Sequence, residues 1–118
     1  MVDPAILRLA AVVASSEDAI ITETLDGTID TWNRSAERMF GYSAAEAIGR
    51  PIEIIVPPDV RAVEDNSSLR VLRGHSNRHF ETIGLTKDDR RIPISVSLSA
   101  VVDPEGHVIG TARHDTTP

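Results

Sequence analysis

The 118-residue sequence contains no cysteine, and this absence excludes several kinds of chemistry. Without thiols the chain can form no disulfide bonds, thiolate metal sites or cysteinyl adducts, which fits a reducing compartment. No apolar run approaches the 18 residues that a membrane-spanning helix needs, and no signal-peptide pattern opens the chain. We therefore expect a cytoplasmic protein without membrane insertion.

Positive charge and aromatic residues are also scarce. Twelve lysines and arginines oppose 18 aspartates and glutamates, which gives a net charge of −6. Because this charge repels phosphate backbones, nucleic-acid binding is not expected. The chain has one tryptophan, one tyrosine and two phenylalanines, so aliphatic residues must supply most of the core. At this length the chain is large enough for one domain and one core.

The sequence has no recognisable catalytic or metal-binding motif. It lacks a Ser/His/Asp arrangement in motif context, a phosphate-binding glycine loop and a His-Glu-x-x-His pair. His75 and His79 are separated by an expected helix end. His107 and His114 are seven apart on one expected strand, which places them on opposite faces. We expect no enzymatic activity and no metal site.

Hydrophobic periodicity predicts two strands, several helices and then three strands. The expected strands cover residues 19–24, 28–32, 77–86, 92–100 and 107–116. The expected helices are one that contains Ala36, Met39 and Phe40 and ends at Gly41, one that begins at Ser43 and ends at Gly49, a turn within 51–57, and one over 59–72. This order predicts an α+β domain with a five-stranded antiparallel sheet and short helices on one face. Before it, Asp3 and Pro4 can start a helix over 5–14. We assign residues 1–17 to an N-terminal helical cap and 18–118 to the domain.

The segment 26–49 carries the most information. Asp26-Gly27 is a hairpin turn signal, because glycine accepts a positive φ. A helix then follows and ends at Gly41. Ser43 stands three residues before Glu46, which is the capping-box spacing that begins another helix.

This segment resembles the PAS domain family of sensory modules. The family pattern is met by Asp26, Gly27, Ile29, Asn33, Ala36, Gly41, Tyr42, Glu46 and Gly49. The stretch 87–93 resembles the family's Lys-Asp-Gly hairpin, with Asp89 in place of the glycine, and Asp115-Thr116-Thr117 resembles its closing Asp-x-Thr motif. The resemblance covers residues 18–117. It implies a PAS-like fold and a bacterial-type signalling role, in a longer polypeptide that also carries a downstream effector.

The apolar residues of the predicted helices and sheet face one another and offer an aliphatic wall for a ligand. The candidate ligand-binding residues are Met39, Phe40, Ile48, Ile52, Ile55, Val56, Val60, Val63, Leu69, Leu72, Ile94, Val96 and Leu98. A filled core is the alternative to a cavity here. If a cavity exists, its lining suits a fatty acid or a similar lipid. Arg61, Arg70 or Arg73 could meet a carboxylate head group at its mouth.

Some PAS domains bind haem or flavin, and both remain alternatives here. In haem-binding members the axial histidine lies on the long helix, but residues 59–72 contain no histidine, cysteine or methionine, and His75 lies just beyond. Photochemistry through a flavin–cysteine bond is excluded, because cysteine is absent. Trp32 is the one tryptophan that could stack on a flavin, and its place before Asn33 favours packing in the core.

Two further expectations concern signalling. The resemblance assigns Asp115 and Thr117 to the junction that relays a change to the downstream effector. The N-terminal helix is apolar on nearly all faces, so Ile6, Leu9 and Val13 are candidate dimerisation residues of a homodimer. A ligand-free dimerisation module is therefore the main rival to an apolar-ligand sensor.

Overall fold

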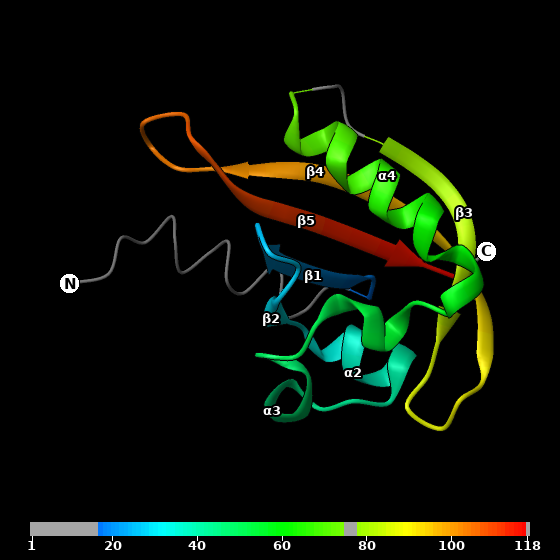
Figure 1. The fold of residues 1–118 in the computed structure, drawn as a ribbon. Coiled ribbons are helices and arrows are strands. Elements are labelled where there is room, and N and C mark those ends of the chain that lie inside the picture. Colours follow the sequence, from blue (N-terminus) through cyan, green and yellow to red (C-terminus); the bar gives the residue numbers. More distant parts are fainter. Residues whose placement is uncertain (1–16, 75–77, 118) are drawn as a thin grey trace.

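The computed structural model describes residues 17–74 and 78–117, and Figure 1 gives its course. The strands are β1 (Ala19–Thr24), β2 (Ile29–Trp32), β3 (Arg78–Leu85), β4 (Arg91–Val102) and β5 (Val108–Thr116). The helices are α2 (Arg34–Phe40), α3 (Ala44–Ala47), α4 (Arg61–Leu72) and the 3₁₀ turns η1 (Ile52–Ile55) and η2 (Pro58–Val60). The predicted N-terminal helix, with Ile6, Leu9 and Val13, lies outside the described residues, as does His75.

The five strands form one antiparallel sheet in the order β2-β1-β5-β4-β3. Figure 1 shows α4 crossing β4 and β5, while α2 and α3 lie beside β1 and β2. The predicted five-stranded antiparallel sheet with short helices is thus confirmed. None of the described helices is both long and apolar enough to cross a membrane.

Short polar contacts define the ends of α2 and α3; the Gly41 end of α2 and the Ser43–Glu46 capping box were predicted, whereas the Asn33 cap was not. The Asn33 side chain accepts a hydrogen bond from Ala36 N and so caps α2, which ends at Gly41 with φ 85°. The same Asn33 also donates to the Asp18 carbonyl and accepts from Ile20 N, which ties α2 to β1. Ser43 and Glu46 form the predicted capping box of α3.

The core lies between the sheet and the helices and is largely aliphatic. Phe40 is fully buried, and a side chain at Gly84 on β3 would come within 2.9 Å of its ring. Trp32 packs against Phe40 with ring centroids 5.8 Å apart and donates from Nε1 to the Tyr42 carbonyl at 2.9 Å. Trp32 therefore has the packing role expected of it.

The inward face of α4 differs from the predicted one. Val63 is 55% exposed and Leu69 is 48% exposed, whereas the buried residues are Glu64, Ser67 and Val71. The spacing of three and four residues is helical, but the inward stripe carries a carboxylate and a hydroxyl, so apolar residues alone marked the wrong face. Ile48 was also expected to face the sheet, and it is half-exposed.

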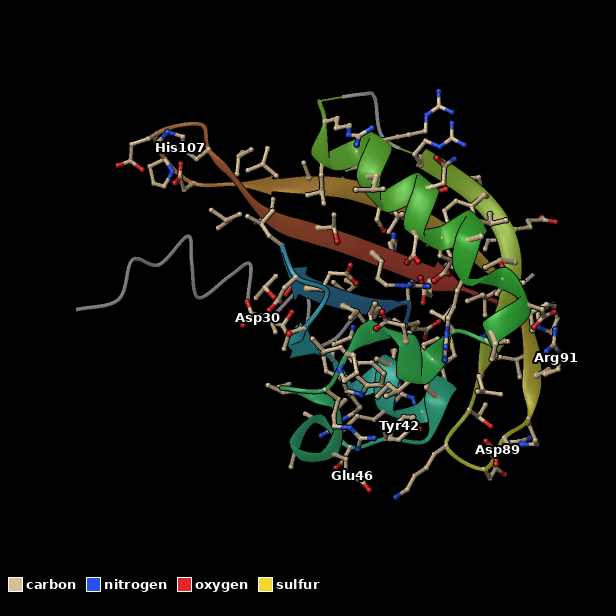
Figure 2. All side chains as sticks on the ribbon, viewed as in Figure 1. Asp30, Tyr42, Glu46, Asp89, Arg91 and His107 are labelled. Carbon is tan, nitrogen blue, oxygen red and sulfur yellow. The ribbon has the colours of Figure 1, made fainter. Side chains whose placement is uncertain are left out.

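The hairpins at the two ends of β4 each contain one residue that departs from a pattern, Asp89 from the family's glycine and His107 from the predicted strand. Asp89, which stands in place of the family's glycine, takes φ 65° and is the one described non-glycine residue with a positive φ. It lies on the β3–β4 hairpin, toward which the α3 residue Glu46 extends to pair with Lys87 (Figure 2). At the other end β5 begins at Val108, so His107 belongs to the β4–β5 turn and not to the strand as predicted.

Candidate functional site

A pocket of about 310 Å³ lies beneath α4, bounded by the β1–β2 turn, η1 and β5. Its apolar lining consists of Leu25, Ile52, Val56, Leu69 and Leu72. Its charged lining consists of Glu23, Asp26, Glu53, Glu64, Asp65, Arg61 and Arg113. The pocket is therefore half aliphatic and half ionic, unlike the apolar wall that the sequence suggested.

The predicted ligand-binding residues separate into three groups. Ile52, Val56, Leu69 and Leu72 line the pocket. Core residues or residues packed against the core are Met39, Phe40, Ile55, Val60, Ile94, Val96 and Leu98. Ile48 and Val63 are largely exposed. Of the three arginines expected at the mouth, Arg61 lines the pocket, whereas Arg70 and Arg73 do not.

A buried ion cluster forms the floor of the pocket. The Arg113 guanidinium on β5 donates to both carboxylate oxygens of Glu64 on α4, at 3.1 Å each. Its Nε lies 3.2 Å from both oxygens of Asp115, two residues along the strand. Arg113 is 4% exposed and Asp115 is fully buried. This bidentate geometry is the strongest that arginine makes with carboxylates, and it joins the helix over the pocket to the last strand.

The electrostatics of the cluster follow from its burial. Burial alone would lower the pKa of Arg113, but the charges of Asp115 and Glu64 raise it above its ordinary value. Burial raises the pKa of Asp115, and the positive charge of Arg113 only partly opposes this. One arginine thus stabilises two carboxylates, and the cluster carries an excess of negative charge.

Glu23 on β1 adds a third carboxylate to this environment. It is 9% exposed and lines the pocket, but no described cation lies within ion-pair distance of it. Burial raises its pKa, while Arg113 and the Thr111 hydroxyl act in the opposite direction. Glu64 and Asp115 each form an ion pair with Arg113, whereas Glu23 forms none with a described residue. The cost of burying its negative charge is therefore offset least.

Sequence reasoning missed Glu23, Glu64 and Arg113, although the strand pairing contained a signal. On the inward face, Val96 lies opposite Asp115 and Leu98 lies opposite Arg113. The predicted alternation of β4 already pointed Val96 and Leu98 inward. Extending that register to β5 would have placed Arg113 and Asp115 in the interior.

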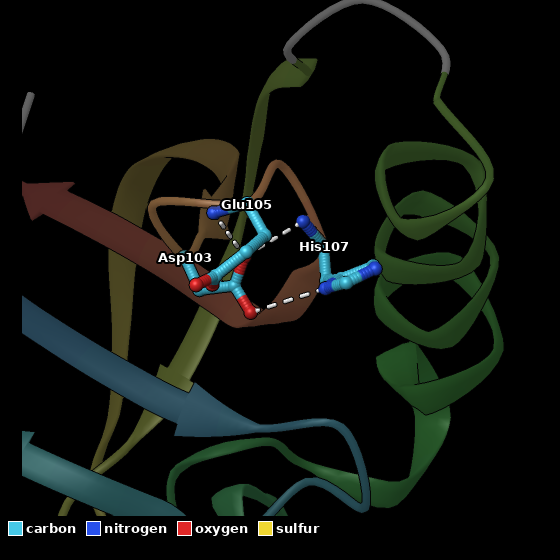
Figure 3. A group of neighbouring side chains, drawn as sticks. All are labelled: Asp103, Glu105 and His107. Carbon is cyan, nitrogen blue, oxygen red and sulfur yellow. Dashed lines mark hydrogen bonds and ion pairs between the residues drawn. The ribbon is translucent and has the colours of Figure 1, made fainter.

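A second group, in the β4–β5 turn, brings metal-ligating side chains together. Asp103, Glu105 and His107 place one ligand atom each within 4.8 Å of one another (Figure 3). Asp103 Oδ1 already accepts hydrogen bonds from the backbone N–H groups of Glu105 and His107, at 3.0 and 2.9 Å. Such an Asp turn accounts for the arrangement without an ion.

The residues around the pocket do not fit haem or flavin. Among the described residues, the lining contains no histidine, cysteine or methionine as an axial ligand for iron. The lining within the same ranges also contains no aromatic side chain on which a flavin ring could stack, and Trp32 is buried in the core instead.

The buried carboxylates give a testable dependence of stability on pH. Because the folded state raises the pKa of Glu23, it holds that proton more tightly than the unfolded chain does. The stability from this proton is present below the ordinary pKa of 4.5 and is lost as the pH rises through the folded value. We expect Glu23→Gln to reduce this loss and to raise the free energy of unfolding at pH 7 by about 1 kcal/mol.

Urea unfolding between pH 4.5 and pH 8 measures this effect. Glu81→Gln is the matched control, because Glu81 is exposed on β3. Side-chain hydrogen bonds are the main reason that the pKa values of the exposed carboxylates Asp26, Asp59 and Asp88 are lowered. Protonation of these groups therefore changes the free energy of unfolding only below about pH 4, outside the measured range. A Glu23→Gln profile that matched the unmodified protein across this range would contradict the prediction.

The sequence is similar to a curated sensor protein. The chain is 34% identical over 96 residues to the sensor protein FixL of Bradyrhizobium diazoefficiens, and the match covers 77% of this chain. The chain spans only about a fifth of that relative, because the match covers 19% of it.

The fold is similar to solved structures from several sources. A PAS domain from Colwellia psychrerythraea superposes with a TM-score of 0.90 at 21% identity, over 97% of both chains. A light-oxygen-voltage domain studied with a flavin analogue superposes with a TM-score of 0.77 at 16% identity, over 95% of this chain and 84% of that one. These identities establish the fold alone. The family model for the PAS fold matches residues 7–114, and the chain therefore belongs to the PAS fold family.

Proposed function

We propose that this chain is a non-catalytic sensory and interaction domain of a signalling protein. In this proposal an apolar small molecule binds beneath α4, and the change passes through β5 to an effector linked in the same polypeptide. PAS domains are generally sensory modules without catalysis of their own, and the similarity to part of a longer sensor protein supports a linked effector. A cytoplasmic location is part of the proposal.

The observation that carries the proposal is the contact between the pocket and the last strand. Glu64 belongs to α4 and lines the pocket, and its carboxylate is paired with Arg113 of β5. A ligand that shifts α4 must therefore change the Glu64–Arg113 pair, and with it the pairing of Asp115. Since a ligand shifts an equilibrium only by its differential affinity for two states, this ion cluster is a physical element that a ligand can bias.

The aliphatic half of the pocket supports an apolar ligand. Ile52, Val56, Leu69 and Leu72 can contact an alkyl chain such as that of a fatty acid or a similar lipid. The alkyl chain of the ligand would lie between α4 and η1, where it would replace water in contact with these aliphatic side chains. The charge of the head group is a separate question, because the other half of the pocket is ionic.

Asp115 is proposed to relay the change, as the Asp-x-Thr motif implies. Its carboxylate points inward to Arg113, while Thr117 is exposed just beyond the end of β5. In this proposal Asp115 couples the junction to the buried cluster, and Thr117 contacts the segment that follows.

Pairing of two copies is the rival function and can accompany ligand binding. The apolar segment with Ile6, Leu9 and Val13 supports a homodimer on sequence grounds. A hollow of about 310 Å³ on the outer face of the sheet, lined by Ile20, Ala112 and His114 among others, offers a surface for such packing.

The first test is mass spectrometry of a denaturing organic extract from the natively purified domain, with an absorbance spectrum of the same sample. We expect a colourless protein that carries an apolar small molecule in stoichiometric amount, because the aliphatic lining favours retention. A blank extract, together with no binding of added alkyl compounds, would remove the ligand-sensing function and leave the dimerisation module.

The second test addresses the relay in the full-length signalling protein. Asp115→Asn keeps the size of the side chain but removes the charge that pairs with Arg113, so we expect a loss of signal-dependent output of about tenfold or more. Asp30→Asn is the matched control, because Asp30 is exposed on β2 (Figure 2). Circular dichroism should confirm that both variants are folded, and unchanged output from a folded Asp115→Asn protein would count against the relay.

The third test addresses pairing. Replacement of Leu9 and Val13 by Asp places two charges in the apolar segment, and we expect sedimentation velocity to show monomers where the unmodified domain forms dimers. If the variant sediments as the unmodified protein does, the N-terminal segment is not the dimer interface.

A further inference from the structure

The charges around the pocket beneath α4 are unsuited to an anionic ligand. Five carboxylates line it, against two arginines. Of these arginines, Arg113 is already paired with both Glu64 and Asp115 through all three of its guanidinium nitrogens. Arg61 is exposed, and its Nε lies 3.4 Å from the Val56 carbonyl. The potential in the pocket is therefore negative, and it favours a cation.

Glu23 supplies a specific counter-ion for such a cation. It is nine-tenths buried and lines the pocket, and among the described residues no Lys, Arg or His lies within ion-pair distance. The neighbouring Thr111 hydroxyl lowers the pKa of the Glu23 carboxyl but carries no charge to pair with it. A buried carboxylate without a paired cation costs free energy, and a cationic ligand that donates to it would recover part of that cost.

The arrangement favours an organic cation over a metal ion. Within the described ranges, the β4–β5 turn is the one place where three carboxylate or imidazole ligands lie within 4.8 Å of one another. The carboxylates of the pocket are not clustered in this way, so they do not form a coordination shell. Leu25, Ile52, Val56, Leu69 and Leu72 instead provide aliphatic surface next to Glu23.

We propose that this pocket binds an amphipathic amine, whose protonated amino group pairs with Glu23 and whose alkyl part lies against Ile52, Val56 and Leu72. This inference rests on the proposed sensory function and assigns a ligand class to its site. A primary ammonium group has three donors, enough for both carboxylate oxygens of Glu23. Its positive charge also relieves the excess of negative charge around Arg113, which links occupancy to the cluster that contacts β5.

The experiment compares two probes with the same chain and opposite charges, octylamine and octanoate, by isothermal titration calorimetry at pH 7. We expect octylamine to bind at least about tenfold more tightly than octanoate, the ratio that a single charge-assisted hydrogen bond supplies. We expect Glu23→Gln to weaken octylamine binding by about tenfold. The matched control Glu81→Gln removes the same charge from the exposed face of β3 and should leave the affinity unchanged.

The outcomes separate this inference from the proposed function. Tighter binding of octanoate, or equal loss of affinity in the two variants, would overturn the amine assignment and leave an apolar-ligand sensor. Absence of binding by both probes would overturn the amine assignment and also count against the sensory function. Selective binding of octylamine that depends on Glu23 would establish the amine assignment.

Discussion

The guanidinium of Arg113 holds two carboxylates that come from distant parts of the chain, Glu64 on α4 and Asp115 near the end of β5. Three charged groups in the interior of a small domain cost several kcal/mol of desolvation each, and mutual pairing must offset this cost. Removal of Arg113 would leave two buried carboxylates without compensation. The positions of α4 and β5 are therefore mutually dependent, and Glu64 and Arg113 of this cluster line the pocket between them.

In the proposed function, a small ligand acts at a distance through this dependence. α4 is not attached to the sheet through a broad apolar face, since Val63 and Leu69 are exposed and only Val71 among its apolar residues is fully buried. Its attachment through Glu64 is directional and sensitive to charge, unlike an apolar contact. In that proposal, a cationic ligand beside Glu23 changes the electrostatic potential at Arg113, which belongs to β5 and is paired with Glu64 of α4. In an entirely aliphatic pocket, a ligand could move α4 through its size and shape, but its charge would not alter the contact between α4 and β5.

The parts of the fold that the sequence predicted well depend on local chemistry. Ser43 and Glu46 cap a helix through contacts within three residues, and Gly41 ends one through its own backbone conformation, so no distant information is needed. The inward face of α4 was mispredicted because a hydropathy pattern assumes that the buried residues of a helix are apolar. Glu64 is buried because it pairs with Arg113, which is 49 positions away in the sequence, and a local pattern does not contain that pairing. The pocket was beyond prediction for a related reason. Its volume depends on how closely side chains from four elements pack, and periodicity does not resolve packing at that scale.

The residues that identify the family and those that form the pocket are almost entirely different sets. Asp26 and Gly27 belong to both, but Asn33, Gly41 and Glu46 make turns and caps away from the pocket. Glu23, Glu64 and Arg113 are not among the residues of the family pattern. A structure with 21% identity can superpose with a TM-score of 0.90, because turns and caps specify the backbone while inward side chains are free to differ. The charge of the proposed ligand is therefore inferred from Glu23 and its neighbours, since the shared fold does not determine which charged side chains line the pocket.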